Sequence, residues 1–99
     1  MPHRTKTGQK VHDGKVAEIA RNLGRKGYSV RADLPGHPKP PALNGQVPDV
    51  LARKGSKVLV QEIETRSTLN TDKKQQQALQ RWADQHDAEF RVILAKKKR

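Results

Sequence analysis

Residues Val47 to Arg66, with the sequence VPDVLARKGSKVLVQEIETR, decide the fold of this chain. Two apolar runs in this stretch predict two β-strands. Gly55 and Ser56 between them predict a two-residue turn, because glycine adopts the positive φ that the first position of a type II′ turn requires. With that turn, Lys54 faces Lys57 and the two strands form an antiparallel hairpin.

The hairpin register predicts that carboxylates converge at its open end. Asp49 lies opposite Glu62, and Glu64 emerges on the same face as Glu62 because side chains alternate along a strand. Two unit charges about 4 Å apart repel by roughly 4 kcal/mol at an effective dielectric of about 20, which favours raised pKa values or a bound cation. Carboxylate oxygens favour Mg²⁺, Mn²⁺ or Ca²⁺ over zinc. Solvent-facing charges at a sheet edge are the alternative interpretation.

The succession of Pro48-Asp49, a turn, an apolar strand and Glu62-Ile63-Glu64 resembles the PD-(D/E)XK nuclease superfamily. This superfamily has the restriction-endonuclease-like fold, and the layout resembles its archaeal Holliday junction resolvases. The resemblance spans about residues 14 to 95 and implies an endonuclease that hydrolyses DNA, branched or junction DNA included, with Mg²⁺ or Mn²⁺ as cofactor. Glu64 stands where the family usually has lysine, as in the E-X-E motif of some restriction enzymes. A catalytically inactive nucleic-acid-binding protein on the same fold is therefore the alternative.

The resemblance also implies roles for single residues. The implied metal ligands are the carboxylates of Glu18, Asp49 and Glu62 and the carbonyl of Ile63. Glu64 would be a general base or a ligand of a second metal. Lys73 or Lys74, predicted at the start of a helix, would supply the positive charge that the family's lysine provides and that Glu64 lacks. From the sequence alone, solvated charges are the default interpretation of these lysines. Glu18 is more often a surface charge, with Arg21 or Arg25 as its partner.

Composition indicates a single small domain with a polyanionic partner. The chain has 99 residues, a net charge of +11 and a hydrophobic fraction of 32%. The charge favours DNA, with RNA as an alternative, and the thin core favours a homodimer. No apolar run approaches the roughly 18 residues that a membrane span needs, and no signal-peptide core is present. We therefore expect a cytoplasmic protein without a membrane partner.

The chain in order predicts an α/β domain, a minimal restriction-endonuclease-like core with a mixed sheet between two helices. We expect a flexible basic arm over residues 1–12, the nuclease-like domain over 13–95 and a basic tail over 96–99. The expected elements are a helix from Asp13 to about Gly24–Gly27, a strand over 28–34, the hairpin, a helix from about residue 70 to His86, and a strand over 90–95. The last strand is nearly continuously apolar, which favours an inner strand covered on both faces.

Basic side chains distributed along the chain are the predicted contacts to phosphates. The predicted nucleic-acid-binding residues are Arg4, Lys6, Lys10, Arg31, Lys54, Lys57, Arg66 and Gln76. Gln76 is included because Gln75, Gln76 and Gln77 resemble a downstream glutamine motif of parts of the superfamily. A solvated N-terminus is the alternative for the arm. The four histidines show no metal-ligand spacing, so we assign them no metal.

Overall fold

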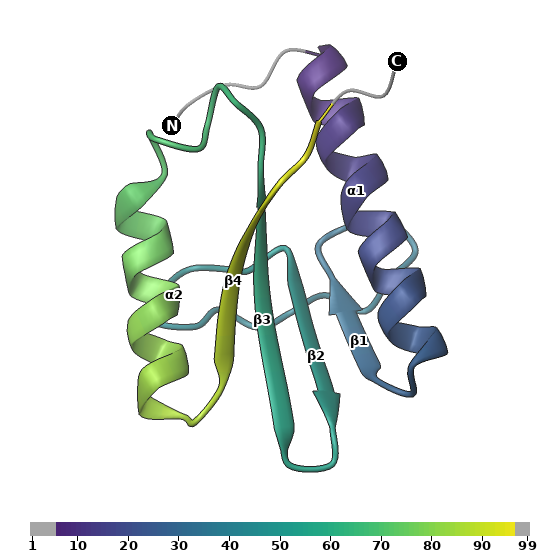
Figure 1. The fold of residues 1–99 in the computed structure, drawn as a ribbon, viewed down its shortest axis with the longest axis vertical. Helices are drawn as coiled ribbons and strands as arrows, with labels where there is room; N and C mark the ends of the chain where they lie inside the picture. The colour runs from purple at the N-terminus through teal and green to yellow at the C-terminus, as the bar shows by residue number, and fades with distance from the viewer. Residues whose placement is uncertain (1–5, 97–99) are drawn as a thin grey trace.

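The computed structural model describes the backbone of residues 6–96 and the side chains of residues 8–96. Helices and strands follow in the predicted order (Figure 1): α1 (Lys6–Arg25), β1 (Ser29–Ala32), β2 (Val50–Lys54), β3 (Lys57–Glu64), α2 (Lys73–Gln85) and β4 (Glu89–Leu94). The prediction of an α/β fold with one mixed sheet and two helices is confirmed. Neither described helix combines the length and the apolar composition that crossing a membrane requires.

The four strands form one sheet in the order β1-β2-β3-β4. The pairs β1–β2 and β2–β3 are antiparallel, whereas β3 and β4 are parallel. Parallel neighbours need a crossover connection, and α2 provides it between β3 and β4. The sheet is therefore mixed, and β3 is the strand that joins its antiparallel and parallel parts.

The predicted hairpin register is confirmed. Val50 pairs with Gln61 and Lys54 pairs with Lys57. Gly55 has φ +59°, and Ser56 is not among the described residues with positive φ, as a type II′ turn requires. This register places Asp49, directly before β2, beside the end of β3.

The two helices bury opposite faces of the sheet. Val16 and Leu23 of α1 pack with Val50 and Ile63, which lie on one face. On the other face, Leu79 of α2 belongs to a second cluster of core residues, together with Leu43, Leu51 and Val60. Neighbouring residues of β2 and β3 alternate between the two clusters, as pleated strands require. The central strands are thus covered on both sides.

The first helix begins at Lys6 rather than near Asp13, so the predicted start was wrong. Residues 6–12, which we expected in the flexible arm, are helical, and residues 1–5 lie outside the described part. A physical reason for the longer helix is the burial of His12, a residue that is only 4% exposed. His12 lies four residues before Val16, so it extends the buried stripe of the helix toward the N-terminus.

The last strand is an edge strand, which corrects the prediction of an inner strand. β4 pairs only with β3 among the described strands, and Val92 on it is 38% exposed. Its apolar side chains are partly covered on each face, since Phe90 packs on the α2 side and Ile93 packs against the core cluster of α1. On the α1 side, Glu89 and Arg91 at the start of β4 are exposed, because α1 packs chiefly against β1 at the other edge of the sheet.

Candidate functional site

The predicted acidic residues meet at one end of the sheet. Asp49 directly precedes β2, while Glu62 and Glu64 lie in the last part of β3. The N-terminal turns of α1 and α2 lie at the same end (Figure 1). The antiparallel hairpin brings Asp49 and the two glutamates together, because β2 leaves this end of the sheet at Val50 and β3 returns to it at Glu64.

Two hydrogen bonds fix Asp49 and Glu62 against each other. The backbone amide of Asp49 donates to Glu62 Oε1 at 2.9 Å, and the amide of Ile63 donates to Asp49 Oδ2 at 2.8 Å. Each carboxylate thus accepts a backbone N–H of the strand that carries the other acid. The sequence predicted that these acids face each other, and these contacts confirm their proximity.

Glu62 is nearly inaccessible, with 2% of its surface exposed. Burial first, and then the neighbouring charge of Asp49, raise the pKa of Glu62 to about 9, against the opposing effect of the Asp49 amide hydrogen bond. Glu64 and Asp72 add smaller contributions in the raising direction. Without a cation, this carboxyl group therefore holds its proton at neutral pH. A divalent cation would compensate the same repulsion by displacing that proton.

Glutamines of the first turns of α2 bind the buried acids. Gln75 Nε2 donates to Glu62 Oε2 at 2.8 Å. Gln76 Nε2 donates to the carbonyl of Leu69 at 3.1 Å and lies 3.5 Å from Glu64 Oε2. The sequence could not choose among three consecutive glutamines, and the helix orientation selects the first two. A nucleic-acid contact by Gln76 stays a prediction, and its described contacts are to the protein.

His12 is a site residue that the sequence analysis missed. Its Nε2 lies 3.2 Å from Asp49 Oδ2, and its Nδ1 lies 2.9 Å from Asp13 Oδ1. The spacing of four residues to Val16 was the available signal. It went unused because the helix was expected to begin after His12. This histidine links α1 to the acids of the hairpin.

Glu18, the acid expected from the first helix, is engaged elsewhere. Its Oε2 forms an ion pair with Lys15 Nζ at 2.8 Å, and about a third of the side chain is exposed (34%). The predicted alternative partners were Arg21 and Arg25, and the described ion pair is with Lys15 instead. Among the described side chains of α1, the contact to Asp49 comes from His12. The role of Glu18 as a metal ligand stays a prediction.

Lys73 and Lys74 lie in the first turn of α2, at the same end of the sheet as the carboxylates. Both side chains are exposed. None of the ion pairs among the described residues joins either lysine to Asp49, Glu62 or Glu64. The structure therefore places both at the rim of the site, and their catalytic role stays a prediction.

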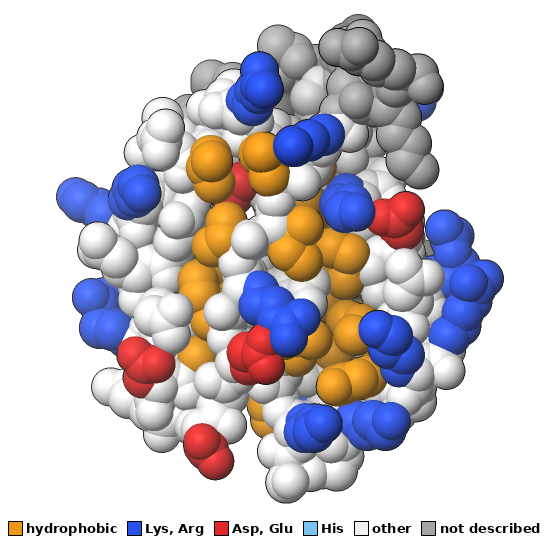
Figure 2. Space-filling model, in the orientation of Figure 1, with side chains coloured by type: hydrophobic (Ala, Val, Ile, Leu, Met, Phe, Trp, Pro, Cys, Tyr) orange, Lys and Arg blue, Asp and Glu red, His pale blue; other side chains and the backbone are white. Residues whose placement is uncertain are grey.

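The predicted phosphate contacts fall into two groups. Lys10 and Arg66 are exposed near the end of the sheet that carries the acids. Lys54 and Lys57 flank the hairpin turn at the opposite end. Arg31 belongs to neither group: it lies on the edge strand β1 and donates to the carbonyl of Lys39 at 3.2 Å. Lys and Arg side chains also surround the margin of the face in Figure 2. Arg4 and the side chain of Lys6 lie outside the described residues.

The ligand atoms at this site are of the type that a hard divalent cation prefers, but their present spacing is not that of a metal site. Carboxylate oxygens of Asp49 and Glu62 and the carbonyl of Ile63 are the ligand types that Mg²⁺ and Mn²⁺ take. Between residues 6 and 96, however, no group of three or more His, Asp or Glu side chains has the spacing of a metal site. A cation at this position requires Glu62 to lose its proton and Gln75 to release Oε2.

No protein-family model matches this sequence, and no curated protein matches it either. The assignment of a function therefore depends on the geometry of Asp49, Glu62 and their neighbours.

We expect His12→Ala to lower the free energy of unfolding by about 1–3 kcal/mol, because it removes a buried side chain and the partner of Asp49. His37→Ala is the matched control, since His37 is exposed in the loop before β2 and a surface change is worth about ±0.5 kcal/mol. Urea unfolding of both variants measures the difference. Equal stabilities of the two variants would contradict the structural role of His12.

Proposed function

We propose that this protein is a divalent-metal-dependent endonuclease that hydrolyses DNA phosphodiester bonds, at branched or junction DNA among its substrates. The observation that carries the proposal is the pair of half-buried Asp49 and buried Glu62, fixed by reciprocal backbone hydrogen bonds at the end of a central hairpin. A buried acid with a pKa near 9 beside a second carboxylate lowers the stability of the fold, so a purely structural role does not account for it. Such an arrangement supports a role in binding a cation.

Asp49, Glu62 and the carbonyl of Ile63 would hold the cation in this proposal. Bound Mg²⁺ or Mn²⁺ would polarise the phosphodiester and lower the pKa of a bound water. The amide of Ile63 fixes the Asp49 carboxylate, and the amide of Asp49 fixes the carboxylate of Glu62 through Oε1. Glu64 is the proposed general base or ligand of a second metal, next to Gln76. Lys73 or Lys74 would contribute positive charge from the rim.

The net charge of +11 supports a nucleic-acid partner, with DNA preferred and RNA as the alternative. A homodimer is part of the proposal, because a symmetric cleaver of junctions needs two sites related by a two-fold axis. We also propose a cytoplasmic location, where DNA is accessible. Each of these proposals is tested separately from the metal site, by competition with RNA, by sedimentation and by fractionation.

A second candidate function is a nucleic-acid-binding protein without catalysis. The observation that favours it is that backbone amides and Gln75 already bind Asp49 and Glu62, while none of the ion pairs among the described residues joins a lysine to either acid. In that case the acids stabilise the strand ends, and the basic side chains bind phosphates. Tight binding of DNA without turnover in any metal would identify this function.

The test is cleavage of labelled four-way junction and linear duplex DNA in Mg²⁺, Mn²⁺ or Ca²⁺. We expect Asp49→Asn and Glu62→Gln to lose at least about 100-fold in rate, because several kcal/mol of charge stabilisation depend on the metal. Asp33→Asn is the matched control, since Asp33 is exposed and paired with Lys39 at 3.4 Å. Wild-type rates in all three variants would contradict the proposed site.

A further inference from the structure

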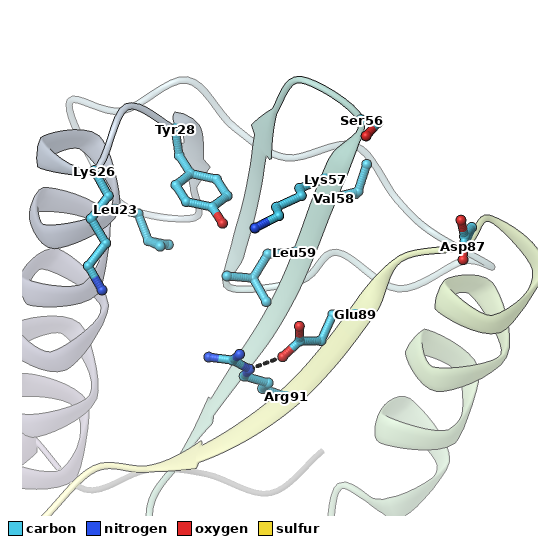
Figure 3. A pocket seen from close by; sticks show the side chains of 10 residues that line it. All are labelled: Leu23, Lys26, Tyr28, Ser56, Lys57, Val58, Leu59, Asp87, Glu89 and Arg91. Atoms are coloured by element: carbon cyan, nitrogen blue, oxygen red, sulfur yellow. Dashed lines mark hydrogen bonds and ion pairs between the residues drawn. The ribbon is translucent and has the colours of Figure 1, made fainter.

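A pocket lies on the face of the sheet that α1 only partly covers (Figure 3). Its volume is about 480 Å³, and sites for small ligands span about 300–1,000 Å³. It opens beside the C-terminal end of α1, because this helix packs chiefly against β1. The first residues of β3 and β4 are therefore accessible on this face.

Apolar and basic side chains share this pocket. The ring of Tyr28 and the side chain of Leu59 lie against the same space as the ammonium group of Lys57 (Figure 3). Leu23 of α1 and Lys26 directly after this helix complete the side toward α1. The pocket thus combines a planar and apolar wall with two lysines.

The charges in and beside the pocket favour an anion. Arg91 and Glu89 form an ion pair with each other, as the dashed line in Figure 3 marks. Lys26 and Lys57 take part in none of the ion pairs among the described residues. Asp87, at the turn before β4, is the other acid of the lining. With Arg91 and Glu89 paired, two lysines face one remaining acid, Asp87, so the lining carries a net positive charge.

Lys54 adds a further positive charge next to Tyr28. Its Nζ donates to the carbonyl of Lys26 at 2.7 Å and lies 5.8 Å from the centre of the Tyr28 ring. This contact ties the hairpin turn to the chain after α1. The Lys54 ammonium is thereby held beside the Tyr28 ring before any ligand binds.

We propose that this pocket binds an unpaired nucleotide of a nucleic-acid strand. The base contacts Tyr28 and Leu59, and the phosphate lies near Lys26 and Lys57. Aromatic rings beside a positively charged groove are how proteins bind single strands without sequence preference. A base inside a duplex is excluded, because neighbouring base pairs cover both of its faces. The inference rests on the proposed function only in that both take a nucleic acid as partner.

The pocket lies away from the carboxylates, so the two sites can be tested independently. Lys57 begins β3 and Glu64 ends it, and a rise of about 3.3 Å per residue separates these positions by roughly 23 Å. A bound strand therefore contacts the pocket with nucleotides several positions away from any that reach Glu62. Variants of the pocket should change binding without removing the metal ligands.

The experiment measures fluorescence anisotropy of labelled dT12 and of the same strand annealed to dA12, with the full-length protein in EDTA. We expect Tyr28→Leu to weaken binding of dT12 about tenfold, whereas Tyr28→Phe retains it because the ring remains. Duplex affinity should stay within about twofold in both variants, because a paired base does not contact the ring. Circular dichroism confirms that both variants are folded.

A charge variant gives an independent measurement. We expect Lys57→Gln to lower the slope of log K against log salt for dT12 by about 0.7, the value for one phosphate of a single strand. Arg21→Gln is the matched control, because Arg21 is exposed on α1 and does not line the pocket. Equal slopes in the two variants would overturn the assignment of the phosphate to Lys57.

Two outcomes would overturn the pocket itself. One is an equal loss of duplex and single-strand binding in Tyr28→Leu, and the other is binding of dTMP as tight as that of dT12, which would indicate a site for free nucleotides. A failure of the proposed nuclease is recognised differently. In that case, dT12 binding still depends on Tyr28, but no DNA is cleaved in any metal.

Discussion

Mn²⁺ binding to this protein is expected to strengthen about 100-fold between pH 6 and pH 8, because Glu62 must lose its proton before it becomes a ligand. Burial and the charge of Asp49 raise the pKa of Glu62 to about 9. Below that value the fraction of ionised Glu62 grows tenfold per pH unit, and the apparent affinity follows it. Calorimetric titration in buffers of different ionisation enthalpy measures both the affinity and the released proton.

The matched variants for this titration are Glu62→Gln and Asp33→Asn. Glu62→Gln should abolish the pH-dependent affinity, since an amide carries no titrating proton and is a poor ligand. Asp33→Asn should bind as the wild type, because Asp33 is exposed and paired with Lys39. Binding that is independent of pH in the wild type would show that the cation does not displace the proton of Glu62.

The second large effect concerns stability in the absence of metal. We expect the free energy of unfolding of the wild type to fall relative to Glu62→Gln as pH rises from 5 to 8. The pKa of Glu62 is about 9 in the folded protein, against 4.5 for an ordinary glutamate. Within this window the folded state keeps a proton that the unfolded chain releases, so the difference grows by about 1.4 kcal/mol per pH unit.

Urea unfolding in EDTA at several pH values tests this expectation. Glu62→Gln keeps an acceptor for the Asp49 amide, and the amide of Gln75 can turn its carbonyl toward the new NH₂ group. Glu89→Gln, a change of an exposed glutamate, is the control and should follow the wild type. Parallel pH profiles of the wild type and Glu62→Gln would mean that Glu62 is ionised in the folded protein.

Local sequence signals were sufficient for the hairpin and therefore for the acid pair. Gly55 determines the turn, the turn determines the register, and the register places Asp49 beside Glu62. Each step depends on backbone geometry within a short stretch of chain. The sequence could therefore predict the element order and this part of the candidate site.

The remaining features depend on tertiary packing that the sequence does not display. His12 was missed because a polar residue at a buried position of a helix becomes visible only when its partner, Asp49, is known. The edge position of β4 was missed because partial cover of Phe90 on one face and of Ile93 on the other requires the same apolar run as an inner strand. The orientation of Gln75 and Gln76 likewise follows from how α2 packs on β3.

The most direct measurement of the central claim is anomalous diffraction from crystals soaked in Mn²⁺ at pH 8. We predict an anomalous peak in contact with the carboxylates of both Asp49 and Glu62, with the hydrogen bond from Gln75 to Glu62 broken. The same soak of Glu62→Gln crystals should show no peak at this position. An empty site in the wild type, with the hydrogen bonds of Asp49, Glu62 and Gln75 all intact, would contradict the proposed metal centre.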